Sequence, residues 1–166
     1  MTDRETPRTC RTSYAGSTAE CYRRFSEAGL APMIVSLTAN EIETVCHQTL
    51  RDWLARKPSQ QERDTMSEAI RDLLLATHET GLCHRDVHID NIVLSDNGRP
   101  LLIDPAYATA SVNEHCYDLE GPEPSGVSVP DDHVNQGGNA AHGIWWGSPE
   151  KHRSLEQEFG LPSRAP

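Results

Sequence analysis

Apolar residues recur at helical spacing in the middle of this chain, and this pattern predicts its longest helix. Between residues 59 and 81 the apolar face consists of Met66, Ile70, Leu73, Leu74 and Thr77, spaced three or four positions apart. Ser59 followed by Glu62 is the pattern of a capping box at a helix start, and Gly81 is a typical residue after a helix end. We therefore predict one helix over this range with a single buried face.

Shorter patterns on either side predict a mixed set of helices and strands. Residues 17–29 repeat the capping signature with Ser17 and Glu20, and Gly29 ends that helix. Residues 31–36 and 41–45 are β-type runs separated by four residues, which predicts a hairpin. A further helix is expected over 47–56 and a helix-like pattern returns over 143–160, whereas residues 1–16 predict a flexible tail or one irregular edge strand.

Two continuous apolar runs, 92–94 and 101–103, predict strands that are covered on both faces. Asn97-Gly98 between them is the signal for a two-residue type I′ turn, since both residues tolerate a positive φ. A turn of this type pairs Ile92 with Ile103, and then Asn91 with Asp104. An amide and a carboxylate are thus expected to meet at the open end of a buried hairpin.

A carboxylate in such a place requires a partner, because a buried and unpaired charge costs several kcal/mol. Mg²⁺ prefers oxygen ligands and commonly takes one or two of them from the protein, which fits Asn91 and Asp104. Asp86 precedes Asn91 by five residues and is expected on a loop above the metal, where it can orient or deprotonate a hydroxyl.

The stretch His84-Arg85-Asp86-Val87-His88-Ile89-Asp90-Asn91 resembles the catalytic loop of protein kinases, H-R-D-x-x-x-x-N. The resemblance implies that Asp86 is the catalytic base and that Asn91 and Asp104 bind Mg²⁺ beside ATP. It also implies that His84 braces the loop and that Arg85 meets a charge on the activation segment. Ser148-Pro149-Glu150 is similar to the A-P-E that ends this segment, which would then occupy residues 107–142.

The substrate class stays open in this comparison. His88 stands where serine/threonine kinases have Lys, and D-x-H-x-x-N with Ile103-Asp104-Pro105 is nearer to the aminoglycoside and fructosamine phosphotransferases. The expected reaction is transfer of the ATP γ-phosphoryl group to a hydroxyl, either on a protein Ser or Thr or on a small molecule. The fold class expected is α/β of the α+β type: a protein-kinase-like domain over 17–152, with a remnant small lobe, a partial helical large lobe, and a C-terminal tail over 153–166.

Two other functions fit parts of the sequence. No G-x-G-x-x-G precedes the first helix, Lys57 and Lys151 are the only lysines, and Glu20 alone can stand for the glutamate that pairs with the kinase strand lysine. The chain can therefore be a degenerate pseudokinase that binds and regulates a partner. Alternatively, His84, Asp86, His88 and Asp90 alternate, so that on an extended strand they would share one face and form a metal-dependent hydrolase site.

The composition of the chain limits which classes of partner it can bind and which cellular compartment we expect for it. The net charge of −10 argues against nucleic acid and anionic membranes, and no apolar run approaches the roughly 20 residues of a membrane span. We expect a cytoplasmic protein whose five cysteines are reduced and mostly buried. Because half of the usual large lobe is missing, we also expect a homodimer or a protein partner that covers the exposed face.

Overall fold

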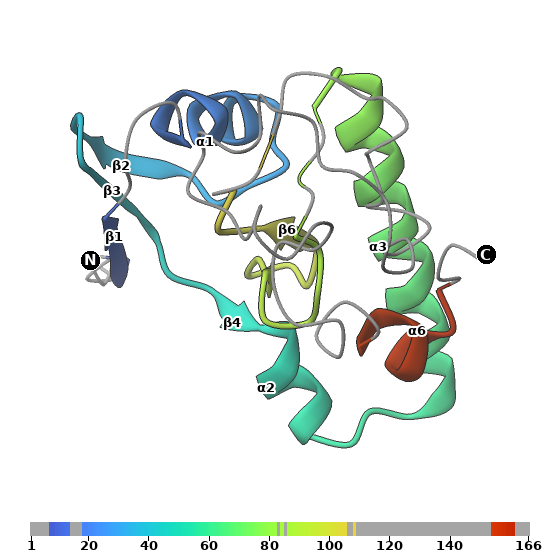
Figure 1. Ribbon diagram of the computed structural model, residues 1–166. Helices are drawn as coiled ribbons and strands as arrows, with labels where there is room; N and C mark the ends of the chain where they lie inside the picture. Colours follow the sequence, from blue (N-terminus) through green and yellow to red (C-terminus); the bar gives the residue numbers. More distant parts are fainter. Residues whose placement is uncertain are drawn as a thin grey trace, which may run out of the picture.

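The computed structural model describes residues 7–13, 18–82, 84, 86–105, 108 and 154–161. In this part of the chain, two three-stranded antiparallel sheets lie beside four helices, and the long helix α3 flanks the second sheet (Figure 1). The mixed α+β class expected from the sequence is confirmed. None of the helices among these residues has the length and the apolar character to span a membrane.

The first sheet has the order β1-β3-β2 and consists of β1 (Thr9–Ser13), β2 (Ile34–Leu37) and β3 (Glu41–Val45). Helix α1 (Thr18–Glu27) connects β1 to β2 and buries Tyr22 and Phe25. Gly29 follows the helix with a φ of 73°, as the sequence predicted for a helix stop. The predicted hairpin of β2 and β3 is confirmed, and β1 is the edge strand that was one of the two readings of residues 1–16.

The second sheet has the order β4-β5-β6 and consists of β4 (Gln48–Thr49), β5 (Ile92–Leu94) and β6 (Pro100–Leu102). Every residue of β5 and β6 is buried, which confirms the prediction from their continuous apolar runs. Helix α2 (Leu50–Ala55) follows β4 directly, because the Thr49 hydroxyl accepts a hydrogen bond from the Asp52 N–H and caps the helix.

The predicted register of the β5–β6 hairpin is wrong by one residue. Leu94 pairs with Pro100 and Ile92 with Leu102, so the connection contains three residues between Ser95 and Arg99. Gly98 alone takes a positive φ, 78°, while Asn97 keeps a negative φ and accepts a hydrogen bond from the Arg99 N–H through its side chain. This is a type I turn with a glycine bulge, which Asn-Gly also favours. Asn91 consequently lies opposite Ile103, not Asp104.

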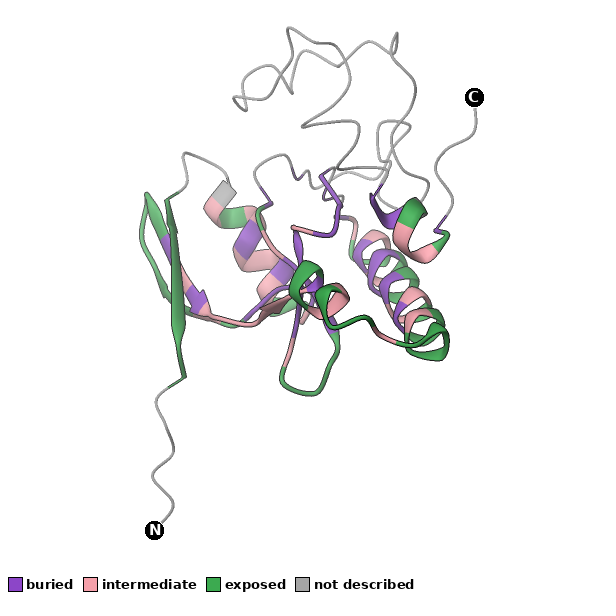
Figure 2. Ribbon diagram, turned by 90° about the horizontal axis from the view of Figure 1, so that it is seen from below, coloured by how far each residue is buried: buried purple, intermediate pink, exposed green. Residues whose placement is uncertain are grey.

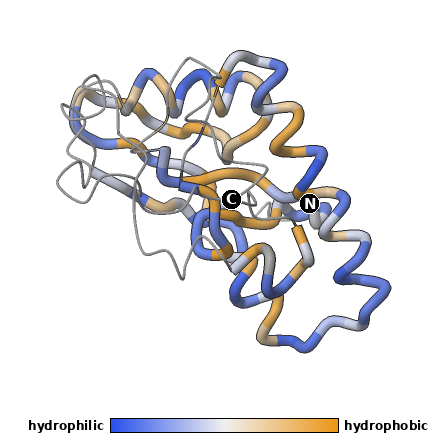
Figure 3. The backbone as a smooth tube through the Cα atoms, turned by 45° about the vertical axis from the view of Figure 1, so that its right-hand side comes forward, coloured by the Kyte–Doolittle hydropathy of each residue, from blue (hydrophilic) through white to orange (hydrophobic). Residues whose placement is uncertain are grey.

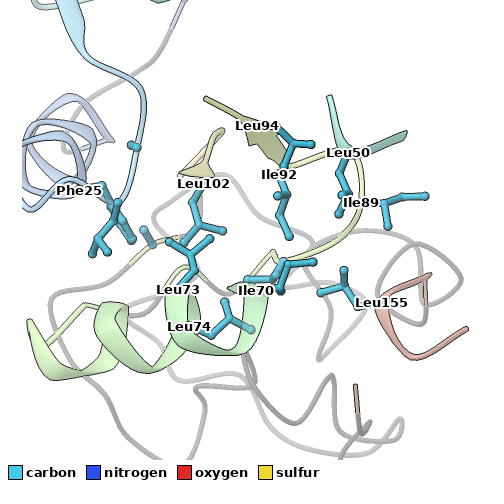
Figure 4. Close-up of a cluster of buried hydrophobic side chains, with 14 of the residues drawn as sticks. Phe25, Leu50, Ile70, Leu73, Leu74, Ile89, Ile92, Leu94, Leu102 and Leu155 are labelled. Atoms are coloured by element: carbon cyan, nitrogen blue, oxygen red, sulfur yellow. The ribbon is translucent and has the colours of Figure 1, made fainter. Parts of the chain in front are cut away.

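Helix α3 (Gln60–Glu79) forms as predicted, with both hydrogen bonds of the Ser59–Glu62 capping box. Its buried face, Met66, Ile70, Leu73, Leu74 and Thr77, packs against the second sheet (Figures 2 and 4). Apolar segments gather in the interior and polar ones along the outer turns (Figure 3). Helix α6 (Ser154–Phe159) packs on α3, where Arg63 pairs with Glu158 and Ser67 donates to the Phe159 carbonyl.

A disulfide joins Cys10 to Cys46, and the prediction that all cysteines are reduced is wrong for this pair. Cys10 lies opposite Thr44 in the β1–β3 ladder, so Cys46 is its diagonal neighbour on the same face. Their Cα atoms are 5.2 Å apart, within the range that a disulfide spans. The two cysteines are 36 positions apart in sequence, so no local pattern indicates that they are close; the pairing of β1 with β3 brings them together.

Candidate active site

The loop from Asp86 to Asn91 leads into β5 and contains three of the candidate site residues, Asp86, His88 and Asn91. Asp86 and Asn91 are only 8% and 6% exposed, and His84 and His88 are buried as well. Polar groups in such places are normally held by hydrogen bonds, since burying them without partners costs free energy. The bonds they make therefore define what the loop can do.

Asn91 clamps the two ends of this loop together. Its Nδ2 donates to the main-chain carbonyl of Asp86 at 2.9 Å and to Asp86 Oδ2 at 3.0 Å. The backbone of Asn91 is itself anchored, because its carbonyl accepts a hydrogen bond from the Ile103 N–H at the end of β6. Asp86 is thus fixed by a side chain that is anchored to the sheet.

His84 ties the start of the loop to the same strand end. The Asp86 N–H donates to His84 Nδ1 at 3.3 Å, so the neutral ring carries its proton on Nε2, which lies 2.8 Å from the Ile103 carbonyl. The ring makes a T-shaped contact with Phe25 on α1, with ring centres 5.8 Å apart. This placement suits the bracing role that the kinase resemblance implies.

His88 lies between two carboxylates. Its Nε2 is 3.6 Å from Asp86 Oδ2, and its Nδ1 is 3.9 Å from Asp90 Oδ2. The Asp90 N–H donates to the same Nδ1 at 3.2 Å. In the neutral ring the proton therefore sits on Nε2 and points toward Asp86.

Asp104 follows β6 and is exposed, with a φ of 56° in the left-handed region. Its carboxylate is close enough to the buried Tyr22 of α1 to act on it electrostatically. The pKa of Tyr22 is raised to about 12, chiefly by burial; the negative charge of Asp104 adds to the rise, and a hydrogen bond with Thr44 opposes it. Helix α1 thus contributes a side chain next to the second predicted metal ligand.

The donor set fits a hard cation such as Mg²⁺. Because Nδ2 of Asn91 faces Asp86, the amide oxygen Oδ1 is the atom that remains to ligate a metal. Asp104 supplies a carboxylate at the surface of the same strand end. Amide and carboxylate oxygens are the ligands that Mg²⁺ accepts, with water and phosphate completing its shell.

Comparison with known proteins agrees with this loop. A family model described as the phosphotransferase enzyme family matches residues 28–112, which is half of the chain and includes α2, α3 and the whole loop. The chain belongs to the phosphotransferase enzyme family. No curated protein matches the sequence.

The fold of this phosphotransferase family member is protein-kinase-like. A solved structure, that of the Cydia pomonella granulovirus kinase PK-1, superposes with a TM-score of 0.54 at 10% sequence identity. The match covers 94% of this chain and 62% of the viral kinase, so the chain spans less than two thirds of that protein. The recognition of a kinase-like phosphotransferase from the catalytic-loop pattern is confirmed.

The structure does not bring Glu20 to the phosphotransferase loop. This side chain is exposed on α1 and bonds to Arg23, at 2.6 and 2.9 Å, which holds the pKa of Glu20 below its usual value. Arg85, Ser148-Pro149-Glu150 and the segment 107–142 apart from Ala108 lie outside the described residues. The roles implied for them therefore stay predictions.

The arrangement required for a metal-dependent hydrolase is contradicted. Residues 88–91 form bends and a turn, so the extended strand on which this hydrolase site was expected is not present there. Both ring nitrogens of His84 are engaged by the backbone. Among the residues that the structure describes, no group of three or more His, Cys, Asp or Glu side chains can hold a metal ion.

Two residues that contact the loop, Arg51 and Ser154, are not indicated by the sequence pattern. Arg51 binds the carboxylate of Asp90, and the Ser154 hydroxyl accepts a hydrogen bond from the Ile89 N–H at 3.2 Å. The partners are 39 and 65 residues apart in sequence, so no local pattern signals them. The sequence shows the additional carboxylate of Asp90 in the loop, but its partner, the guanidinium of Arg51, is brought to it only by the fold.

Proposed function

We propose that this protein transfers the γ-phosphoryl group of ATP to a hydroxyl, on a protein Ser or Thr or on a small molecule. The observation that carries the proposal is the buried carboxylate of Asp86, held by Asn91 at 3.0 Å in a loop that the family match includes. A fixed carboxylate at the start of this loop is the group that phosphoryl transfer to a hydroxyl requires.

In this proposal Asp86 orients the acceptor hydroxyl and takes its proton, a role worth roughly 10²- to 10⁴-fold in rate. Asn91 and Asp104 are the residues that would hold Mg²⁺, which when bound neutralises charge on the phosphates. His84 and Asn91 keep the Asp86 carboxylate and backbone in one position, so that little reorganisation accompanies the reaction. The chain's own contribution is therefore orientation and proton transfer.

Assays of phosphoryl transfer from labelled ATP with Mg²⁺ test the proposal, with generic protein acceptors in one arm and aminoglycosides and sugar amines in the other. The Asp86→Asn and Asp104→Asn variants should each lose transfer by at least roughly 10²-fold. Asn is chosen at position 104 because it tolerates the left-handed backbone there.

Asp72→Asn is the matched control, since Asp72 is exposed on α3 and lies outside the loop. Circular dichroism of all three variants confirms that they are folded. Full transfer by Asp86→Asn, with wild-type rates and the same acceptor, would overturn the proposed role.

A second function, that of a catalytically degenerate binding protein, is favoured by one observation. Strand β1 contains no lysine, and its single cation, Arg11, pairs with Glu43 at 3.4 Å and with Glu41 at 4.0 Å. Arg11 is therefore engaged with acidic side chains of β3. A thermal shift assay with ATP separates the two functions: a Mg²⁺-dependent rise in Tm supports the phosphotransferase, and no shift supports the degenerate protein.

A further inference from the structure

An ion pair between Arg51 and Asp90 fastens the catalytic loop to helix α2. The guanidinium binds the carboxylate in a two-pronged manner, with Nε 2.5 Å from Oδ1 and Nη2 2.9 Å from Oδ2. The bond raises the pKa of Arg51, chiefly through the hydrogen bonds to Asp90. A planar, bidentate pair of this kind fixes the direction of the carboxylate as well as its distance.

Asp90 in turn approaches one ring nitrogen of His88 with two groups, its backbone N–H and its carboxylate. Its backbone N–H donates to His88 Nδ1 at 3.2 Å, and its carboxylate oxygen Oδ2 lies 3.9 Å from the same nitrogen. Arg51 binds that oxygen, and the oxygen lies beyond hydrogen-bond distance of the ring nitrogen. The backbone donor is then the group that engages Nδ1.

The proton of the neutral ring consequently lies on Nε2, which is 3.6 Å from Asp86 Oδ2. This separation is longer than a hydrogen bond but requires only a small movement of either side chain to become one. His88 is nearly fully buried, so the ring has little freedom to turn. Four side chains therefore form a continuous chain from the surface of α2 to the proposed base.

We propose that Arg51 and Asp90 are positioning residues that hold His88 with its Nε2–H directed at the carboxylate of Asp86. The inference rests on the proposed function, because it assigns Asp86 as the group to be positioned. It adds to that function a support from α2, outside the catalytic-loop pattern. The support acts on the orientation of Asp86, so its loss should lower kcat and leave the KM for ATP unchanged.

The Arg51→Met variant removes the cation and keeps much of the side chain's apolar length. We expect kcat to fall roughly 10- to 100-fold with an unchanged KM for ATP, as for a small misplacement of a catalytic group. Arg51→Lys keeps the charge without the bidentate fork and should recover part of the loss. The double variant Arg51→Asp with Asp90→Arg restores the pair in reverse and should recover more activity than either single change.

Arg71→Met is the control, since Arg71 is an exposed arginine on α3 and its removal changes the net charge equally. Equal kcat values in Arg51→Met and Arg71→Met would overturn the inference. Arg51 is exposed on α2, so neither variant removes a buried side chain, and thermal melts of both verify that they are folded.

A spectroscopic measurement separates this inference from the proposed function. Long-range ¹H–¹⁵N spectra of the full chain report which ring nitrogen of His88 carries the proton, whether or not the protein transfers phosphate. We expect the Nε2–H form in the wild type and in Arg71→Met, and a mixture of forms in Arg51→Met. If the His88 signals are identical in all three proteins, the inference fails even if the phosphotransferase activity is confirmed; if they differ as expected in an inactive protein, only the proposed function fails.

Discussion

The side-chain amide of Asn91 donates hydrogen bonds to two oxygens of Asp86, the main-chain carbonyl at 2.9 Å and Oδ2 at 3.0 Å. One amide thus fixes both the backbone and the carboxylate of the proposed base. Because the amide nitrogen faces the acid, the amide oxygen is left for the cation proposed above. The structural clamp and the proposed metal ligand are therefore the same buried residue.

Replacing Asn91 by Ala should therefore destabilise the protein as well as inactivate it. The buried Asp86 carboxylate would lose a charge-assisted hydrogen bond, which costs about 1–3 kcal/mol. Urea denaturation measures this free energy. Asn40→Ala is the control, because Asn40 lies in an exposed turn, and it should change stability by less than about 0.5 kcal/mol. Equal stabilities of the two variants would show that the clamp contributes nothing.

The turn between β5 and β6 can be tested by two substitutions, of which Asn97→Gly distinguishes it from the expected type I′ turn. Gly98→Ala should cost about 1 kcal/mol through the positive φ alone, since no atom lies within 4 Å of an added Cβ. Asn97→Gly should also destabilise, by about 0.5–1 kcal/mol, because Asn97 has a negative φ and its side chain accepts two hydrogen bonds. In a type I′ turn, Asn97→Gly would be neutral or stabilising, and that result in thermal melts would contradict the observed register.

Local patterns predicted the secondary structure well because the signals lie close together in sequence. The capping box of α3 and the glycine after α1 each act within a few residues, and both are found. The hairpin register failed because Asn-Gly is compatible with two turn types that differ by one residue. The difference is settled by packing of β5 and β6 on both faces, which a local pattern does not encode.

The sequence predicted which residues of the loop form the candidate site, but it did not predict the contacts that hold them. Asp86, His84, His88 and Asn91 were all found from the catalytic-loop pattern. Their partners were not, because Arg51 and Ser154 reach the loop only after α2 and α6 have docked. Asn91 was expected to face Asp104, whereas its amide nitrogen binds Asp86, a preference that depends on the shape of the loop.

The Cys10–Cys46 disulfide should contribute measurably to stability. A disulfide across a sequence separation of 36 restricts the unfolded chain and so raises the free energy of unfolding by about 2–4 kcal/mol. We expect dithiothreitol to lower the Tm of the wild type and to have no effect on a Cys10→Ser, Cys46→Ser double variant. Cys21→Ser is the control, since Cys21 is a free, half-buried thiol, and it should keep the sensitivity to reductant. A wild-type Tm that is unchanged by full reduction, verified by mass spectrometry, would argue against a stabilising disulfide.

The proximity of Asp104 to Tyr22 predicts how the protein responds to alkaline pH. Burial and the charge of Asp104 raise the pKa of Tyr22 from 10.0 to about 12, so the folded state disfavours the phenolate. Because the folded pKa lies above the unfolded value, this contribution to stability is complete below pH 10 and is lost as the pH rises through 12. In Asp104→Asn the negative charge is absent, so the pKa of Tyr22 should fall, as followed by the ¹³Cζ shift of Tyr22. Asp72→Asn removes an equal charge from an exposed position on α3 and should leave that pKa unchanged. A Tyr22 titration that is the same in all three proteins would show that the charge of Asp104 does not act on Tyr22.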